Sequence, residues 1–320
     1  MKDFWYDHFV ETLLAKYPKK TQLTQALTDL LCIEREAVYR RLRKDVAFPI
    51  HEIVKIASAW NISLDTVIGV NPGQVSFLMQ TIDYLDPSTE HLNELNRRLQ
   101  RLEHLKNYPD SEYLVVCNNL SRTFSSGFES LYKFNVFKWN YEYGGKEGTP
   151  LLFAQMNLTE EIREIAHRYY QLMKTPGHTS VIFDQMLFEY LVRDIKYFQS
   201  ILLINEAEKE LLKKELHELL EYLLDVANKG YYPETKRKVA IYISKVNINT
   251  NYSYFYTEKL KICRVHAFNK YDICTFDPEM LDSFRAWMQL KKRTSIQISE
   301  VDEKSRIEFF IKQHQLVDSL

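Results

Sequence analysis

The chain has 320 residues, of which 45% are hydrophobic and 27% are charged, and its formal net charge is −1. This composition is typical of a soluble globular protein long enough for two or three domains. It contains no run of about eighteen apolar residues, and its amino terminus lacks the basic and then apolar pattern of a signal peptide. Neither a membrane span nor secretion is therefore predicted.

The cysteines favour a cytoplasmic location. Cys32 and Cys117 are isolated, and the set as a whole shows none of the paired spacings of a zinc site, so reduced thiols are the simplest interpretation. Cys263, His266 and Cys274 are close in sequence. On an extended strand, however, Cys263 and His266 point to opposite faces, which argues against a shared zinc ion. We predict no metal and no cofactor.

The first domain is predicted to be all helical and to span residues 1–70. Residues 21–44 indicate two short helices joined at Cys32, because apolar side chains recur every three or four positions on either side of it. Two helices this short cannot bury their apolar faces alone, so the flanking segments must cover them. An earlier helix within residues 1–18 has on one side Phe4, Trp5, Phe9 and Leu13.

The second of the two short helices carries a basic polar face. Glu36 lies in its first turn, where a carboxylate suits the positive end of the helix dipole. The outward side chains suit phosphates and guanine edges, to which Arg can donate two hydrogen bonds. The alternative is a solvated basic face that makes surface ion pairs. The outward residues are Arg35, Tyr39, Arg40, Arg43 and Lys44.

The charge of this domain limits its affinity for nucleic acid. Residues 1–70 contain ten Lys or Arg and nine Asp or Glu, so the basic character is confined to one helix and the cluster of Lys16, Lys19 and Lys20. Strong non-specific binding is not expected, and a dimer is expected to be needed for affinity.

Residues 21–69 resemble the lambda-repressor-like (Xre, or Cro/C1) helix-turn-helix family, through VYRRLRK and the following FPIHEIVKIASAWNISLDTVIG. The resemblance implies that the helix ending at Leu31 crosses the DNA backbone, that the helix 34–43 enters the major groove, and that the helix 49–60 closes the core. Cys32 replaces the usual turn Gly, which requires a backbone that is not left-handed, and Thr24 replaces a usual Gln. The candidate DNA contacts are Arg35, Glu36, Tyr39, Arg40, Arg43, Lys44 and Thr24.

Residues 71–108 are predicted to be a helical connector. Asn71-Pro72-Gly73 ends the first domain, and Asp86-Pro87-Ser88 begins a helix with Ser88 as its N-cap. Two interpretations stay open: one amphipathic helix packed on its own chain, or a short coiled coil that dimerises or signals. The seam has the 3-4-3 spacing of a coiled coil in Leu92, Leu95, Leu99 and Leu102.

Residues 109–320 are predicted to form an α+β region, so that the whole chain is mainly α with a C-terminal α+β part. Its first part, 112–120, is a short apolar run typical of a buried strand, and the aromatic segment 124–145 reads as a helix that passes into a strand at KFNVFKWNYEY. Residues 159–229 indicate a three-helix unit, whose second helix is placed at 180–200.

The last ninety residues predict a small antiparallel sheet. Its three strands are KVAIYISKV, NYSYFYTE and LKICRVHAF, with RTSIQIS as a further candidate. Helices are predicted from Asp277-Pro278 and across 303–316. By analogy alone, such a region can hold a small-molecule effector pocket or an oligomerisation surface.

No catalytic motif accompanies these elements. The sequence has no Walker loop, GxSxG, HExxH or glycine-rich nucleotide turn, so no enzyme is predicted. The leading hypothesis is a homodimeric transcriptional regulator that binds double-stranded DNA and has a C-terminal region for effector sensing or oligomerisation. The alternative is a non-enzymatic adaptor whose helical domain binds a partner protein.

Overall fold

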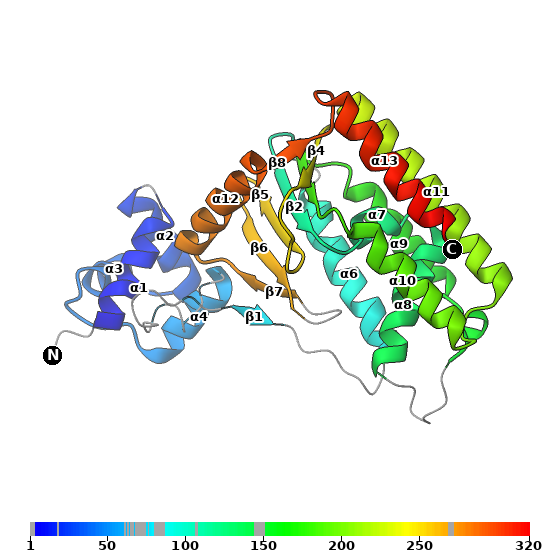
Figure 1. Ribbon diagram of the computed structural model, residues 1–320. Helices are drawn as coiled ribbons and strands as arrows, with labels where there is room; N and C mark the ends of the chain where they lie inside the picture. Colours follow the sequence, from blue (N-terminus) through cyan, green and yellow to red (C-terminus); the bar gives the residue numbers. More distant parts are fainter. Residues whose placement is uncertain are drawn as a thin grey trace. The chain divides into compact units, whose positions relative to one another are not determined.

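The computed structural model describes residues 4–17, 19–60, 62, 64, 67, 75, 77–79, 87–105, 108–143, 151–267 and 272–320 (Figure 1). The chain divides into two compact units, Met1–Phe77 and Leu78–Leu320. It is mainly helical with a substantial β part, as predicted. The described helices include none that is long and apolar enough to cross a membrane.

The N-terminal unit is helical. Its core forms where the helices present their apolar sides to one another, with Phe9, Leu27 and Val38 completely buried. The predicted bounds 34–43 and 49–60 agree with the observed helices within one residue. Most of the closing segment 61–69, and the predicted break at Asn71-Pro72-Gly73, lie outside the described residues. The helices are α1 (Phe4–Ala15), α2 (Lys20–Leu31), α3 (Arg35–Leu42) and α4 (Ile50–Trp60).

The turn between α2 and α3 differs from the expectation at Cys32. This residue has φ 56° and ψ 43°, which is the left-handed region. Its N–H donates to the carbonyl of Thr28 at 2.9 Å and closes the end of α2. The condition for Cys at this turn, a backbone that is not left-handed, is therefore not met. A residue with a Cβ is strained in this conformation, so the turn keeps a cost that glycine would not have.

The second unit is built on one sheet. Among the described residues, the strand order is β1-β7-β6-β5-β2-β3-β4-β8. Neighbours β2, β3 and β4 are parallel, and the remaining pairs are antiparallel. The strands are β1 (Leu78–Met79), β2 (Glu112–Cys117), β3 (His178–Phe183), β4 (Lys238–Ser244), β5 (Tyr252–Tyr256), β6 (Lys261–His266), β7 (Asp272–Thr275) and β8 (Ser295–Gln297).

The prediction of a three-stranded antiparallel sheet was wrong in extent and in order. The strands β4 and β5 follow each other in sequence but do not pair, because β2 and β3 lie between them. Most of the β3 segment was assigned to a helix that starts near Ser180. Residues 179–183 are fully buried, but the run is short, and periodicity alone cannot distinguish it from a buried helix. The second helix of the region therefore begins at Leu187 rather than Ser180.

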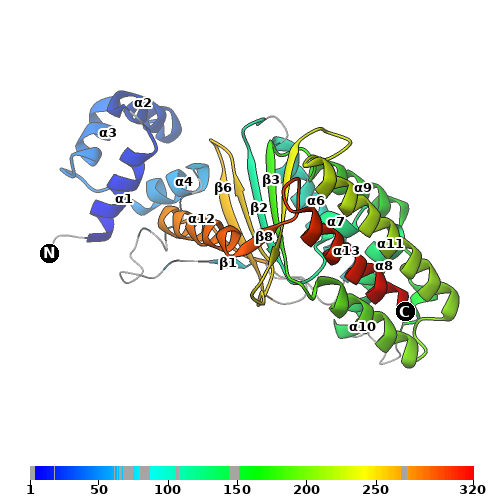
Figure 2. The same cartoon turned by 45° about the horizontal axis from the view of Figure 1, so that its top comes forward.

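Helices cover both faces of the sheet. Figures 1 and 2 show α12 (Pro278–Arg293) on one face of the sheet and the other large helices of the second unit on the opposite face. KFNVFKWNYEY belongs to α8, so the prediction of a strand there was wrong. Its apolar residues alternate with Lys133, Asn135, Lys138, Asn140 and Glu142, which mimics the period of two of a strand. The opposite face carries α6 (Pro87–Leu105), α7 (Arg122–Ser125), α8 (Glu129–Tyr143), α9 (Glu160–Leu172), α10 (Leu187–Ser200), α11 (Glu206–Lys229) and α13 (Glu303–Asp318).

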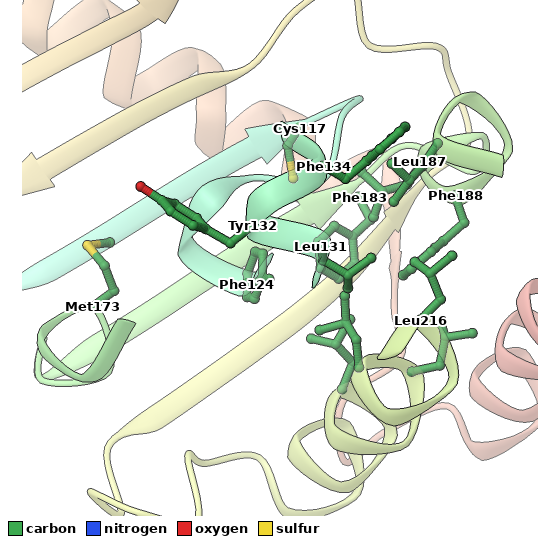
Figure 3. Close-up of a cluster of buried hydrophobic side chains, with 14 of the residues drawn as sticks. Cys117, Phe124, Leu131, Tyr132, Phe134, Met173, Phe183, Leu187, Phe188 and Leu216 are labelled. Carbon is green, nitrogen blue, oxygen red and sulfur yellow. The ribbon is translucent and has the colours of Figure 1, made fainter. Parts of the chain in front are cut away.

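The larger core lies between the sheet and this helical layer. Figure 3 shows side chains of this core that come from β2, from β3 and from several helices. Examples are Phe134 of α8, Phe183 of β3 and Leu216 of α11. The predicted leucine seam of α6 belongs to this core, since Leu95 and Leu99 are buried in it. In this structure the seam therefore packs on its own chain. The expected N-cap Ser88 was wrong, because α6 begins at Pro87 and Ser88 lies in its first turn; the side chain of Ser88 lies outside what is described.

Candidate nucleic-acid interface

The polar side of α3 is the candidate interface. Val38 is completely buried against the core of the N-terminal unit, and this orients the opposite side of the helix to solvent. We define the α3 face as the exposed residues of this side, which include six of the seven predicted contacts. They are Arg35, Glu36, Tyr39, Arg40, Arg43 and Lys44.

Two cations of the α3 face are already compensated. The side chain of Arg43 contacts Glu36 at 3.0 Å and Asp45 at 3.3 Å. The ammonium of Lys44 lies 2.5 Å from a carboxylate oxygen of Asp7. Exposed pairs of this kind contribute little to stability. They do cancel charge, however, so these two cations attract a polyanion less than the sequence suggests.

The other two cations, Arg35 and Arg40, make no ion pair with an acidic residue in the described part of the chain. Arg35 donates a hydrogen bond to the side-chain oxygen of Gln25, a neutral partner. Arg40 makes no side-chain hydrogen bond or ion pair with the described part of the chain. Tyr39 lies between them in sequence and is 38% exposed. This part of the α3 face therefore combines two uncompensated guanidinium groups with an aromatic hydroxyl.

The predicted contact Thr24 does not belong to this surface. Its side chain is 2% exposed, and its hydroxyl donates to the carbonyl of Lys20 at 2.8 Å within α2. The α2 residue that reaches the α3 face is Gln25, whose amide also donates to Asp29 at 2.7 Å. A register shifted by one residue would have identified Gln25 instead of Thr24.

Arg41, the remaining Arg of α3, has a structural role. Its guanidinium donates to both carboxylate oxygens of Glu52, at 2.7 and 2.9 Å, and to the carbonyl of Ala37 at 3.1 Å. This fork joins α3 to α4. The hydroxyl of Tyr6 adds a second link, because it accepts from the N–H of Phe48 at 3.0 Å and lies 3.2 Å from the carbonyl of Arg41.

Cys263 and His266, which are close in sequence, lie on opposite faces of the sheet. Cys263 is completely buried on the α12 face of the sheet. His266 lies on the opposite face, where its Nδ1 is 3.0 Å from Asp272. Within the described ranges no group of three or more His, Cys, Asp or Glu side chains is arranged to hold a metal ion.

Comparison with known proteins adds no assignment. No protein-family model, curated protein or solved structure matches this chain.

Proposed function

We propose that this protein is a sequence-specific DNA-binding regulator of transcription. In this proposal α2 and α3 act as a lambda-repressor-like helix-turn-helix, and the α3 face enters the major groove. The observation that carries the proposal is the pair of uncompensated guanidinium groups of Arg35 and Arg40 on an exposed helix. Arg is the side chain that reads guanine through two hydrogen bonds, and the Arg41–Glu52 fork supports the helix that presents it.

The charge distribution supports a homodimer in this proposal. Two guanidinium groups in a nearly neutral unit neutralise few phosphates, so one unit alone binds DNA weakly. Two units on adjacent half-sites double the contacts and specify a two-fold symmetric operator. The second unit would provide oligomerisation or effector sensing.

A test of the proposal is selection of genomic DNA fragments by the purified full chain, followed by titration of the enriched sequence. We expect a palindromic motif. The double variant Arg35→Ala, Arg40→Ala is expected to lose about tenfold or more in affinity, because each guanine-reading Arg contributes roughly 1–3 kcal/mol.

The matched control is Lys55→Ala, which removes an exposed cation from α4. It should bind the operator as the wild type does. Equal binding by the double variant and the wild type would show that the α3 face is not the recognition surface.

An adaptor that binds a partner protein is the second candidate. It is favoured by the exposed apolar side chains of α4, where Ile50 is 71% and Val54 is 47% exposed, and by the acidic partners of Arg43 and Lys44. Failure to enrich any DNA sequence at low salt, where phosphate contacts are strongest, would support this function instead.

A further inference from the structure

The second unit contains a cavity of about 170 Å³ above the sheet. Helices α6, α8 and α9 and the segment of α7 contribute to its wall, and β2, β5 and β6 contribute to its floor. The wall includes several ionisable groups together with aromatic side chains. The aromatic side chains of the lining are those of Tyr113, Trp139 and Tyr169. Tyr252 also borders the cavity, but its ring packs against Phe284 and Trp287 on the α12 face of the sheet.

The floor of the cavity has a small residue, Ser253, between two larger ones. Val115 of β2 is paired with Ser253 of β5, which is paired with Arg264 of β6. These side chains share one face of the sheet, and the serine leaves space between its neighbours. In an adjacent row of the same face, Tyr113 is paired with Phe255, and both are buried.

Two carboxylates neutralise cations of the wall: Asp272, which lines the cavity, and Glu94, which contacts the lining residues Arg98 and Arg122. Glu94 lies 2.5 Å from Arg98 and 3.0 Å from Arg122. Asp272 lies 2.7 Å from Arg98 and 3.0 Å from Nδ1 of His266. Burial opposes ionisation of Glu94, but Arg122 and Arg98 outweigh it and lower its pKa to about 2. Both acids are therefore charged at neutral pH, and their acceptor oxygens face cations.

A third guanidinium has no acid of its own. Arg264 lines the cavity and makes no ion pair with any residue that the structure describes. Its charge does reach Asp272: burial would raise the pKa of this carboxyl, whereas Arg98, His266 and Arg264 hold it well below its usual range. Another cation of the lining, Lys138, is paired with Asp194 at 2.5 Å. The excess positive charge is thus located at Arg264.

We propose that this cavity binds a small organic anion whose carboxylate or phosphate pairs with Arg264. A guanidinium presents N–H donors in a planar fork that matches either group, and a half-buried cation without a partner is stabilised by an incoming anion. The aromatic part of the lining suits the carbon skeleton of such a ligand. A cavity of about 170 Å³ has room for roughly ten non-hydrogen atoms.

The binding part of this inference is independent of DNA recognition, whereas calling the ligand an effector rests on the proposed function. Binding is therefore measured on the full chain without DNA. Inorganic phosphate, small phosphate monoesters, monocarboxylates and dicarboxylates are tested at about 10 mM by thermal shift, and the ligands that stabilise are titrated by calorimetry. The neutral amide of each carboxylate is the ligand control. We expect at least one anion, and no amide, to raise the melting temperature.

The variant Arg264→Gln separates a binding role from a structural one. It should weaken anion binding by about tenfold or more. It should leave the melting temperature of the ligand-free protein close to the wild-type value, because Arg264 makes no ion pair with the described residues and its attraction to Asp272 is opposed by repulsion from the neighbouring guanidinium groups. The control Arg193→Gln changes an exposed Arg of α10 and should alter neither quantity.

Three results would overturn the inference: no anion of the panel stabilises the protein, Arg264→Gln binds as tightly as the wild type, or Arg264→Gln lowers the melting temperature of the ligand-free protein. The last would show that the guanidinium serves the fold. Loss of DNA binding in the α3 variants would leave all these measurements unchanged, so the two proposals fail separately.

Discussion

Arg41 and Glu52 form a two-bond ion pair that connects α3 to α4, with 16% and 8% of their side chains exposed. The pair takes one cation away from the candidate interface and uses it to hold the helix that carries the others. Position along α3 therefore decides whether an Arg contacts solvent or supports the fold.

Replacing Glu52 by Gln should destabilise the N-terminal unit by about 3 kcal/mol. The reason is that the mostly buried guanidinium of Arg41 would keep its positive charge but lose the carboxylate that compensates it. Hydrogen exchange of the α3 and α4 amides measures this loss. The double variant Arg41→Met, Glu52→Met should lose less than the sum of the two single changes. Additive losses would mean that the fork contributes nothing as a pair.

Replacing Cys32 by Gly should stabilise the N-terminal unit by about 0.5–1 kcal/mol, because glycine adopts the left-handed conformation of this turn without the strain of a Cβ. The same hydrogen-exchange measurement applies. Cys32→Ala serves as the control and should differ little from the wild type, since alanine retains the Cβ. A glycine variant that is less stable than the alanine variant would contradict the assignment of strain to this turn.

The acid dependence of stability should change when Glu94 is replaced by Gln. The pKa of Glu94 is lowered in the fold to about 2 from an ordinary value of 4.5. Ionised Glu94 therefore stabilises the fold fully above pH 4.5, and this contribution is lost as the pH falls toward 2. At about pH 7 the variant should lose about 3 kcal/mol in the free energy of unfolding, as linkage requires.

Chemical denaturation at about pH 7 and about pH 3 tests this prediction. At the lower pH the difference between wild type and variant should fall to roughly 1–2 kcal/mol. Asn93→Gln, an exposed change on the same helix, controls for non-specific effects on α6. A difference that is constant with pH would show that Glu94 acts through packing rather than through its charge.

Local patterns were sufficient where a helix buries one side. Residues 21–60 contain apolar side chains at helical spacing, and the observed α2, α3 and α4 follow them closely. The exposure of Arg35 and Arg40 follows from the same periodicity. These features depend on neighbours within a few positions, which is the range over which sequence patterns are informative.

Patterns failed where the deciding partner is distant or the run is short. The sequence around Arg41 does not indicate that its partner is Glu52 of the next helix. The sequence around Thr24 does not indicate that the neighbouring Gln25 accepts a hydrogen bond from Arg35. The short buried run of β3 and the alternating polar and apolar residues of α8 each suit more than one period. Tertiary contacts resolved both ambiguities.

The sequence by itself determined the helices of the N-terminal unit, most strands of the second unit and the absence of a known catalytic motif, because these depend on local composition and spacing. Only the tertiary structure decided the strand order that brings Ser253 beside Val115. It alone placed Arg264 in the same cavity as Arg98 and Arg122, the two partners of Glu94. The physical reason is that a charge is compensated by whatever lies within a few ångströms of it, and chain separation carries no information about that distance.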